Sequence, residues 1–143
     1  MRMYYIFNVK SDVASLYRNN PSSLYKILES IYFMHREEVD YGFNIFKQIT
    51  NKIKVSELSN LIYIKMHKDM IYSKISDEHI INDLYKDEVS ILKVKSSHLL
   101  LESNKSYPSF FKLLHILNSD YFVCDFKDKD FFFIDNVVKM VSN

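Results

Sequence analysis

The stretch that decides the fold is residues 106–138, SYPSFFKLLHILNSDYFVCDFKDKDFFFIDNVV. A helix is predicted to begin near Pro108, because the missing N–H of proline would have no partner in a first helical turn, and Ser106 can cap the donors that remain. Two strands, Tyr121–Phe126 and Phe131–Val137, follow on either side of a short charged turn. They are too apolar for both faces to meet water, so we expect the hairpin inside a sheet with the helix packed over it.

The rest of the chain adds helices and strands around this unit. Predicted helices begin at Ser11, at Pro21, near Arg36 with an end near Asn51, and at Ser56, and a brief helix follows Ser76 with Ile80, Ile81 and Leu84 as its apolar residues. Predicted strands are Met3–Val9, Val89–Val94 and His98–Leu101. The sequence therefore predicts an α+β fold, one domain over residues 1–143, with a small, mostly antiparallel sheet packed against several helices.

Composition excludes several classes of protein. Lys and Arg number 19 against 18 Asp and Glu, with the two signs interspersed, so the sequence has no basic stripe for direct nucleic-acid binding. No apolar run approaches the roughly 20 residues of a membrane span. A single cysteine cannot form an internal disulfide, and the N-terminus lacks the pattern of a secretion signal. We expect a cytoplasmic protein that contacts neither membrane nor nucleic acid.

The histidines, the cysteine, the aspartates and the glycine do not show the spacings typical of catalytic or metal-binding sites. The five histidines are scattered without an i, i+4 pair. Cys124 lies in an apolar run that would raise the pKa of its thiol. Lysines interrupt the aspartates of residues 120–130, which indicates a solvated turn and not a calcium loop. Gly42, the only glycine, lies in a helical pattern and is expected to allow close packing. We predict no enzyme activity, cofactor or metal.

The third predicted helix carries two stripes of apolar or amphipathic side chains. Its core stripe is Val39, Phe43, Phe46 and Ile49. A neighbouring stripe, which the first leaves outside, is Tyr41, Ile45 and Gln48 at i, i+4 and i+7. Because grouped exposed aromatic and apolar residues mark interaction sites, the second stripe indicates a contact surface. Burial in the core is the alternative for Tyr41 and Ile45, as it is for Tyr17.

Both ends of the chain carry motifs of a known family. The chain opens with an aromatic strand, a lysine and a short helix ending in tyrosine, written here as Tyr4–Lys10, Ala14 and Tyr17. It closes with a Phe- and Leu-rich helix, an apolar strand ending in Asp-Phe, a polar turn and an aromatic strand, at positions Phe110, Phe111, Leu114, Asp125, Phe126, Phe131 and Phe133. In these motifs the sequence resembles the sporulation inhibitor of replication family, SirA.

The resemblance implies a protein-binding inhibitor of DNA replication initiation. Members of this family are not enzymes; they bind the N-terminal domain (domain I) of the initiator DnaA and block its assembly at the origin. Tyr17 matches the second aromatic anchor of the family's first helix, and Val13 stands where the family has a phenylalanine. Ile45 and Gln48 are nearest to the family's glutamine and tyrosine on the third helix. Loss of an aromatic at an interface centre commonly costs about 2 kcal/mol, or about thirtyfold in affinity.

Two departures and two alternatives accompany this interpretation. Asn19–Pro21 replaces a Gly-basic-Glu motif, and Phe132–Asn136 replaces Gly-Trp-Leu-Asn-Pro. One alternative is a small ligand-binding or enzymatic domain with a pocket between sheet and helices that uses His67 or His79. The other is a homodimer formed through the same patch. The interpretation that we favour is a monomer whose contact residues for DnaA are Val13, Tyr17, Tyr41, Ile45 and Gln48.

Overall fold

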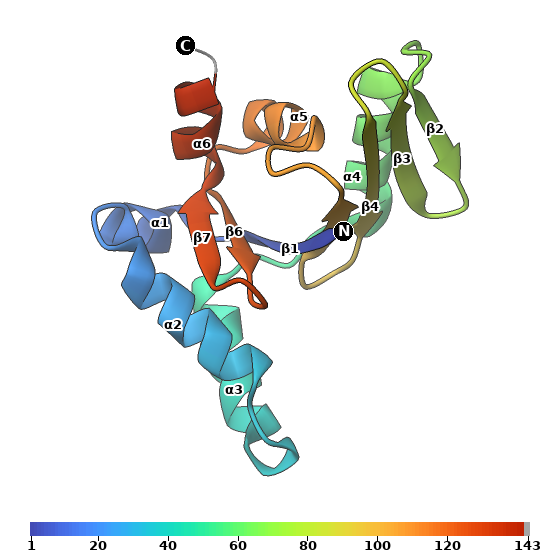
Figure 1. Cartoon of the computed structure of the whole chain (residues 1–143). Coiled ribbons are helices and arrows are strands. Elements are labelled where there is room, and N and C mark those ends of the chain that lie inside the picture. Colours follow the sequence, from blue (N-terminus) through green and yellow to red (C-terminus); the bar gives the residue numbers. More distant parts are fainter. Residues whose placement is uncertain (142–143) are drawn as a thin grey trace.

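Within residues 1–141, which the computed structural model describes, seven strands form one antiparallel sheet in the order β2-β3-β4-β5-β1-β6-β7 (Figure 1). The strands are β1 Arg2–Asn8, β2 Tyr72–Ile75, β3 Glu78–Asp83, β4 Glu88–Val94, β5 Leu99–Ser103, β6 Tyr121–Asp125 and β7 Asp130–Phe133. The helices are α1 Ser11–Tyr17, α2 Pro21–Tyr32, the short 3₁₀ helix η1 Arg36–Glu38, α3 Val39–Ile49, α4 Val55–Met66, α5 Phe110–Leu117 and α6 Ile134–Val141. The α+β prediction is confirmed.

The sheet is buried on both faces at its centre. Tyr4 and Ile6 of β1 belong to a first core cluster with residues of α5, whereas Phe7 belongs to a second cluster with Leu24 and Leu28 of α2. Strand β6 alternates in the same way. Because successive side chains of a strand point to opposite faces, a strand covered on both sides reads as a continuous apolar run. This is why the stretch around Tyr121–Phe126 decided the fold correctly.

Two predicted elements were wrong. The last strand ends at Phe133 instead of Val137, and α6 begins at Ile134. Ile134 and Val137, three positions apart, are both buried in the first cluster, which the spacing of a helix permits. The brief helix expected after Ser76 is instead β3, which pairs with β2 and β4. An apolar pair such as Ile80–Ile81 fits either type of element, and the neighbouring strands decided between them.

The predicted cap of α5 was also wrong. No side chain of the helix's own N-cap residue closes its first turn. The buried carboxylate of Glu88, on β4, instead accepts hydrogen bonds from the Ser109 amide at 3.0 Å and from the Ser109 hydroxyl. Ser106 contributes its carbonyl, which accepts a hydrogen bond from the Tyr4 hydroxyl at 3.1 Å. A negative charge suits a helix N-terminus, so Glu88 joins β4 to α5.

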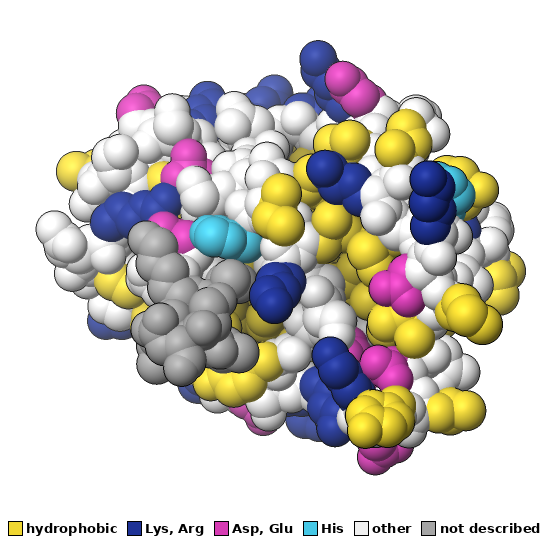
Figure 2. Space-filling model, turned by 90° about the horizontal axis from the view of Figure 1, so that it is seen from above, with side chains coloured by type: hydrophobic (Ala, Val, Ile, Leu, Met, Phe, Trp, Pro, Cys, Tyr) yellow, Lys and Arg dark blue, Asp and Glu magenta, His cyan; other side chains and the backbone are white. Residues whose placement is uncertain are grey.

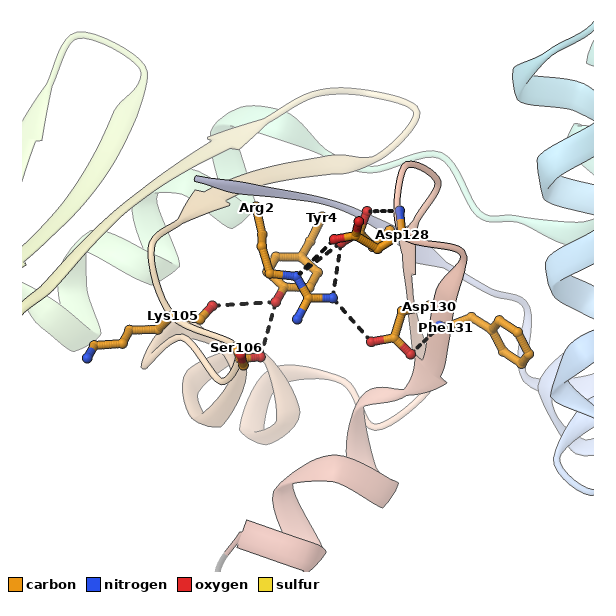
Figure 3. Close-up of polar contacts among 8 residues, drawn as sticks. Arg2, Tyr4, Lys105, Ser106, Asp128, Asp130 and Phe131 are labelled. Carbon is orange, nitrogen blue, oxygen red and sulfur yellow. Dashed lines mark hydrogen bonds and ion pairs between the residues drawn. The ribbon is translucent and has the colours of Figure 1, made fainter.

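The acidic turn after β6 binds an arginine from the start of the chain (Figure 3). The Arg2 guanidinium lies 3.0 Å from Asp125 and 3.3 Å from Asp130, with Asp128 at 3.7 Å and the Tyr4 ring beneath it. Asp128 is exposed as predicted, but the Asp125 side chain is only 3% exposed. The interpretation of this turn as simply solvated was therefore wrong for Asp125, whose charge a cation distant in sequence compensates.

The face of the molecule seen in Figure 2 carries charged side chains of both signs, interspersed as the sequence indicated. Apolar side chains line a hollow on the side of α4 and β2–β4. No continuous stripe of lysine and arginine crosses this face.

Candidate protein-binding site

The start of α1 is held against the end of α3. Val9 and Thr50 form an isolated antiparallel bridge next to the two helix ends. Beside it, the Lys10 amide donates a hydrogen bond of 2.9 Å to the Ile49 carbonyl. These contacts fix the helix ends relative to each other, although about forty positions separate them along the chain.

The end of α1 is held by Arg18. Its guanidinium donates to the carboxylates of Asp120 and Asp135 and to the Ser119 carbonyl. The same group lies 4.5 Å from the centre of the Phe133 ring, a cation–π contact. The segment before β6 and the start of α6 thus hold the residue that directly follows Tyr17, so α1 is fixed at both of its ends.

Three of the five predicted contact residues pack against the same core cluster. Val13 and Tyr17 of α1 and Ile45 of α3 are half-buried, and all three pack against the second core cluster. Gln48 is exposed one turn after Ile45, and Tyr41 is exposed one turn before it. The geometry of a helix, about 100° per residue, places the three α3 residues within about 60° of one another. They share one flank of α3.

Tyr17 is neither wholly buried nor fully exposed. Part of its ring packs on the second cluster, and the rest faces solvent. Leu16, the preceding residue of α1, is 74% exposed, so this end of the helix presents further apolar surface. Tyr41 is 68% exposed. A half-buried aromatic with exposed apolar neighbours is the arrangement that an interface anchor needs, because the buried part fixes the rotamer and the exposed part is available to a partner.

An apolar groove lies on the other flank of α3, and the sequence analysis missed it. Val39 and Phe43, predicted for the core, are 51% and 56% exposed and line a cavity of about 310 Å³ between α2, α3 and the sheet. The predicted helix was also too long, because residues 36–38 form η1. In Figure 1, α2 and α3 extend beyond the sheet, so no sheet surface covers their distal ends. The signal was present in the number of large apolar residues between Ile31 and Phe46.

Close packing at Gly42 shapes this groove. A Cβ atom at Gly42 would lie 2.5 Å from the sulfur of Met34, closer than real Cβ contacts. The absence of a side chain therefore lets the α2–η1 connection approach α3, as the sequence indicated. Both residues line the groove.

The two histidines of the enzymatic alternative, His67 and His79, both contact groups of the fold itself. His79 is fully buried, with Nε2 2.8 Å from the Ser59 hydroxyl and Nδ1 2.7 Å from the Tyr72 hydroxyl. Burial lowers the pKa of His79 to about 4, so the ring is neutral at physiological pH. Both ring nitrogens are occupied by partners within the fold. His67 is exposed at the end of α4, where its Nδ1 lies 3.1 Å from the Tyr63 carbonyl.

The cysteine and the possible metal ligands among the described residues are further candidates for a chemical site. Burial raises the pKa of the Cys124 thiol well above its ordinary value, which keeps it protonated. In the part of the chain that the structure describes, no three His, Cys, Asp or Glu side chains converge as metal ligands. Of the helices in that same part, none combines the length and the hydropathy that a membrane span requires.

Comparison with known proteins decides the family. A family model described as "Sporulation inhibitor of replication protein SirA" matches residues 2–138, nearly the whole chain. The chain belongs to the SirA family. The resemblance noted at the two ends of the sequence is thereby confirmed, and the SirA match also covers the middle of the chain, where no motif was specific. No curated protein matches the chain. The SirA description names inhibition of replication during sporulation and no catalytic activity.

Proposed function

We propose that this SirA family member inhibits replication initiation by binding the N-terminal domain of DnaA with α1 and the Tyr41–Gln48 flank of α3. The observation that carries the proposal is the half-buried Tyr17, held on a helix that is fixed at both ends. A fixed anchor loses little side-chain entropy when it binds, so more of its buried area contributes to affinity. The protein acts by occupying a surface of DnaA, and initiator assembly at the origin then fails.

The contact surface combines anchors from two helices. Tyr17 inserts into an apolar groove of the partner, and Val13 and Ile45 border it as smaller apolar contacts. Tyr41 and Gln48 lie at the exposed edge, where a tyrosine supplies both ring area and a hydroxyl and a glutamine supplies hydrogen bonds. The protein works as a cytoplasmic monomer without a cofactor and without touching nucleic acid.

The proposal is tested by titrating the isolated N-terminal domain of DnaA into the full chain and measuring heat or anisotropy. Wild type is expected to bind, and Tyr17→Ala to lose about thirtyfold in affinity, which corresponds to about 2 kcal/mol. Tyr85→Ala is the matched control, because Tyr85 is 99% exposed in the turn between β3 and β4, far from α1 in the fold. Failure of wild type to bind at about tens of micromolar, or equal binding by Tyr17→Ala, refutes the proposal.

Val13 provides a test in the opposite direction. The side chain is half-buried at the edge of the second cluster, so part of it faces the proposed partner. Val13→Phe adds aromatic area at the position of the family's phenylalanine and is expected to raise affinity for the DnaA domain up to about thirtyfold. A circular dichroism spectrum of the variant distinguishes a change in binding from a change in folding.

A further inference from the structure

We propose that the groove on the Val39–Phe43 flank of α3 binds an acidic peptide segment that carries one or two large apolar side chains. This surface is separate from the α1 surface assigned to DnaA. About 100° per residue places Val39 and Phe43 roughly half a turn from Tyr41, Ile45 and Gln48 around α3. The two flanks can therefore be occupied at the same time, and the two proposals can fail independently.

The first half of the groove is apolar. A cavity of about 310 Å³ is lined by rings and aliphatic side chains of β1, α2 and α3, among them Tyr5, Tyr32, Val39, Phe43 and Phe46. Tyr32 is 48% exposed, comparable to Val39 and Phe43 at the mouth. A space of this size is at the lower end of ligand pockets and suits one or two large side chains. Exposed rings grouped around a hollow are costly in water unless a partner covers them.

The second half of the groove is basic. A hollow of about 620 Å³ adjoins the first and shares Phe43, Phe46 and Ser97 with it. Its lining includes Lys10, Lys47 and Lys52, together with hydroxyl groups, and no carboxylate among the described residues lines either half.

The three lysines are placed to receive negative charge. Within residues 1–141, none of Lys10, Lys47 and Lys52 lies within ion-pair distance of a described carboxylate. The Lys47 ammonium lies 4.5 Å from the centre of the Phe43 ring, at the boundary between the two halves. A ligand with an apolar group in the first half would thus meet a cation directly beside it. Charge complementarity selects an acidic occupant.

The shape selects a peptide. The groove follows α3 from Val39 to Thr50, a length of about 16 Å at 1.5 Å per residue. That length corresponds to about three turns of a partner helix, and an amphipathic helix laid into an apolar groove is a common mode of peptide recognition. The open second half suits a chain that runs along α3 and then leaves the surface.

The test uses a phage-displayed library of random peptides, each about three helical turns long, selected on the immobilised full chain. Selected peptides are expected to combine Asp or Glu with Phe, Leu or Trp. The best one, made with a fluorescent label, is expected to bind at least tenfold more weakly to Lys47→Glu and to Phe43→Ser, measured by anisotropy. Lys86→Glu is the matched control, because Lys86 is an exposed lysine in the turn between β3 and β4. Phe43 is more than half exposed, so its replacement leaves the core in place.

Several results would overturn the inference. Selected peptides without acidic residues, or with equal affinity for Lys47→Glu, remove the role of charge. A dimer of the full chain in size-exclusion chromatography that Phe43→Ser dissociates makes the groove a self-interface. Binding to anionic phospholipid vesicles that the peptide displaces and that Phe43→Ser abolishes makes it a lipid site.

Separate measurements distinguish this proposal from the DnaA proposal. Tyr17→Ala is expected to keep its affinity for the selected peptide, and Phe43→Ser to keep its affinity for the DnaA domain. Displacement of the peptide by the DnaA domain would show that the two ligands share one surface. It would refute the proposal of a separate groove site. If wild type binds the DnaA domain but no acidic peptide, the groove proposal alone is refuted.

Discussion

Arg18 connects the stability of the fold to the proposed binding surface. Replacement of Arg18 by Gln removes a cation that contacts the carboxylates of both Asp120 and Asp135. It also removes the cation–π contact with Phe133. Gln keeps part of the aliphatic stem and an amide NH₂ group that can donate hydrogen bonds, so the change removes the charge and the cation–π contact while leaving a polar side chain.

The expected magnitude follows from burial. The side chains of Arg18, Asp120 and Asp135 are 27%, 25% and 15% exposed, between surface pairs and fully buried ones. Exposed ion pairs contribute about 0–1 kcal/mol, and breaking a buried pair costs about 3–5 kcal/mol. We therefore expect Arg18→Gln to lower the free energy of unfolding by about 2 kcal/mol, or about thirtyfold in the folding equilibrium. Because α1 loses its C-terminal attachment, the affinity for the DnaA domain should fall as well.

The assay is unfolding in urea, monitored by circular dichroism. The dependence of the unfolding free energy on urea concentration must be the same for all variants, so that a shift of the midpoint reports a change in stability. Arg18→Gln, Asp120→Asn and the double variant form a cycle that isolates the coupling between the two groups. Lys86→Gln, an exposed lysine, is the control and should change stability by less than about 0.5 kcal/mol. A loss for Arg18→Gln no larger than that of the control, or a coupling near zero, would refute the role given to Arg18.

Three further predictions concern the fold. Arg2→Met leaves the buried Asp125 carboxylate without its cation and should lower the free energy of unfolding in urea by about 2–3 kcal/mol. Asp128→Asn, at an exposed side chain, should lower it by less than about 0.5 kcal/mol, and equal losses would contradict the burial argument. Burial lowers the pKa of His79 from 6.5 to about 4, so the unfolded chain binds this proton more readily than the folded one. The free energy of unfolding should therefore fall by at most about 3 kcal/mol as the pH drops from about 6.5 towards 4. His79→Gln should flatten that pH profile. Lys129, at φ 55° in the turn after β6, should gain about 0.5–1 kcal/mol on replacement by Gly, seen as a higher melting temperature, while an unchanged or lower value would show that the turn is not strained.

Elements with a single consistent period could be predicted from the sequence. The helix from Pro21 was found because apolar residues recur at helical spacing, and the strand from Tyr121 because it is a short, continuous apolar run. The wrong predictions lie where the apolar pattern fits both a helix and a strand. Residues 131–137 are apolar enough for a strand, but the chain turns at Ile134 so that Val137 can reach the first cluster. Ionic contacts were also missed, since Arg2 and Asp125 are 123 positions apart.

The sequence by itself determined the family, the α+β class and the burial of the central strands on both faces. Apolar runs and periodicity report which positions prefer to leave water, and this preference is local. Only the tertiary structure decided which apolar positions are covered. Val39 and Phe43 satisfy the pattern of a core, yet α2 and α3 extend past the sheet and leave them in an open groove (Figure 1). The pairing of Arg18 with Asp120 and Asp135 likewise depends on which segments the fold brings together. A buried charge needs a partner, and that partner cannot be identified from the local sequence pattern.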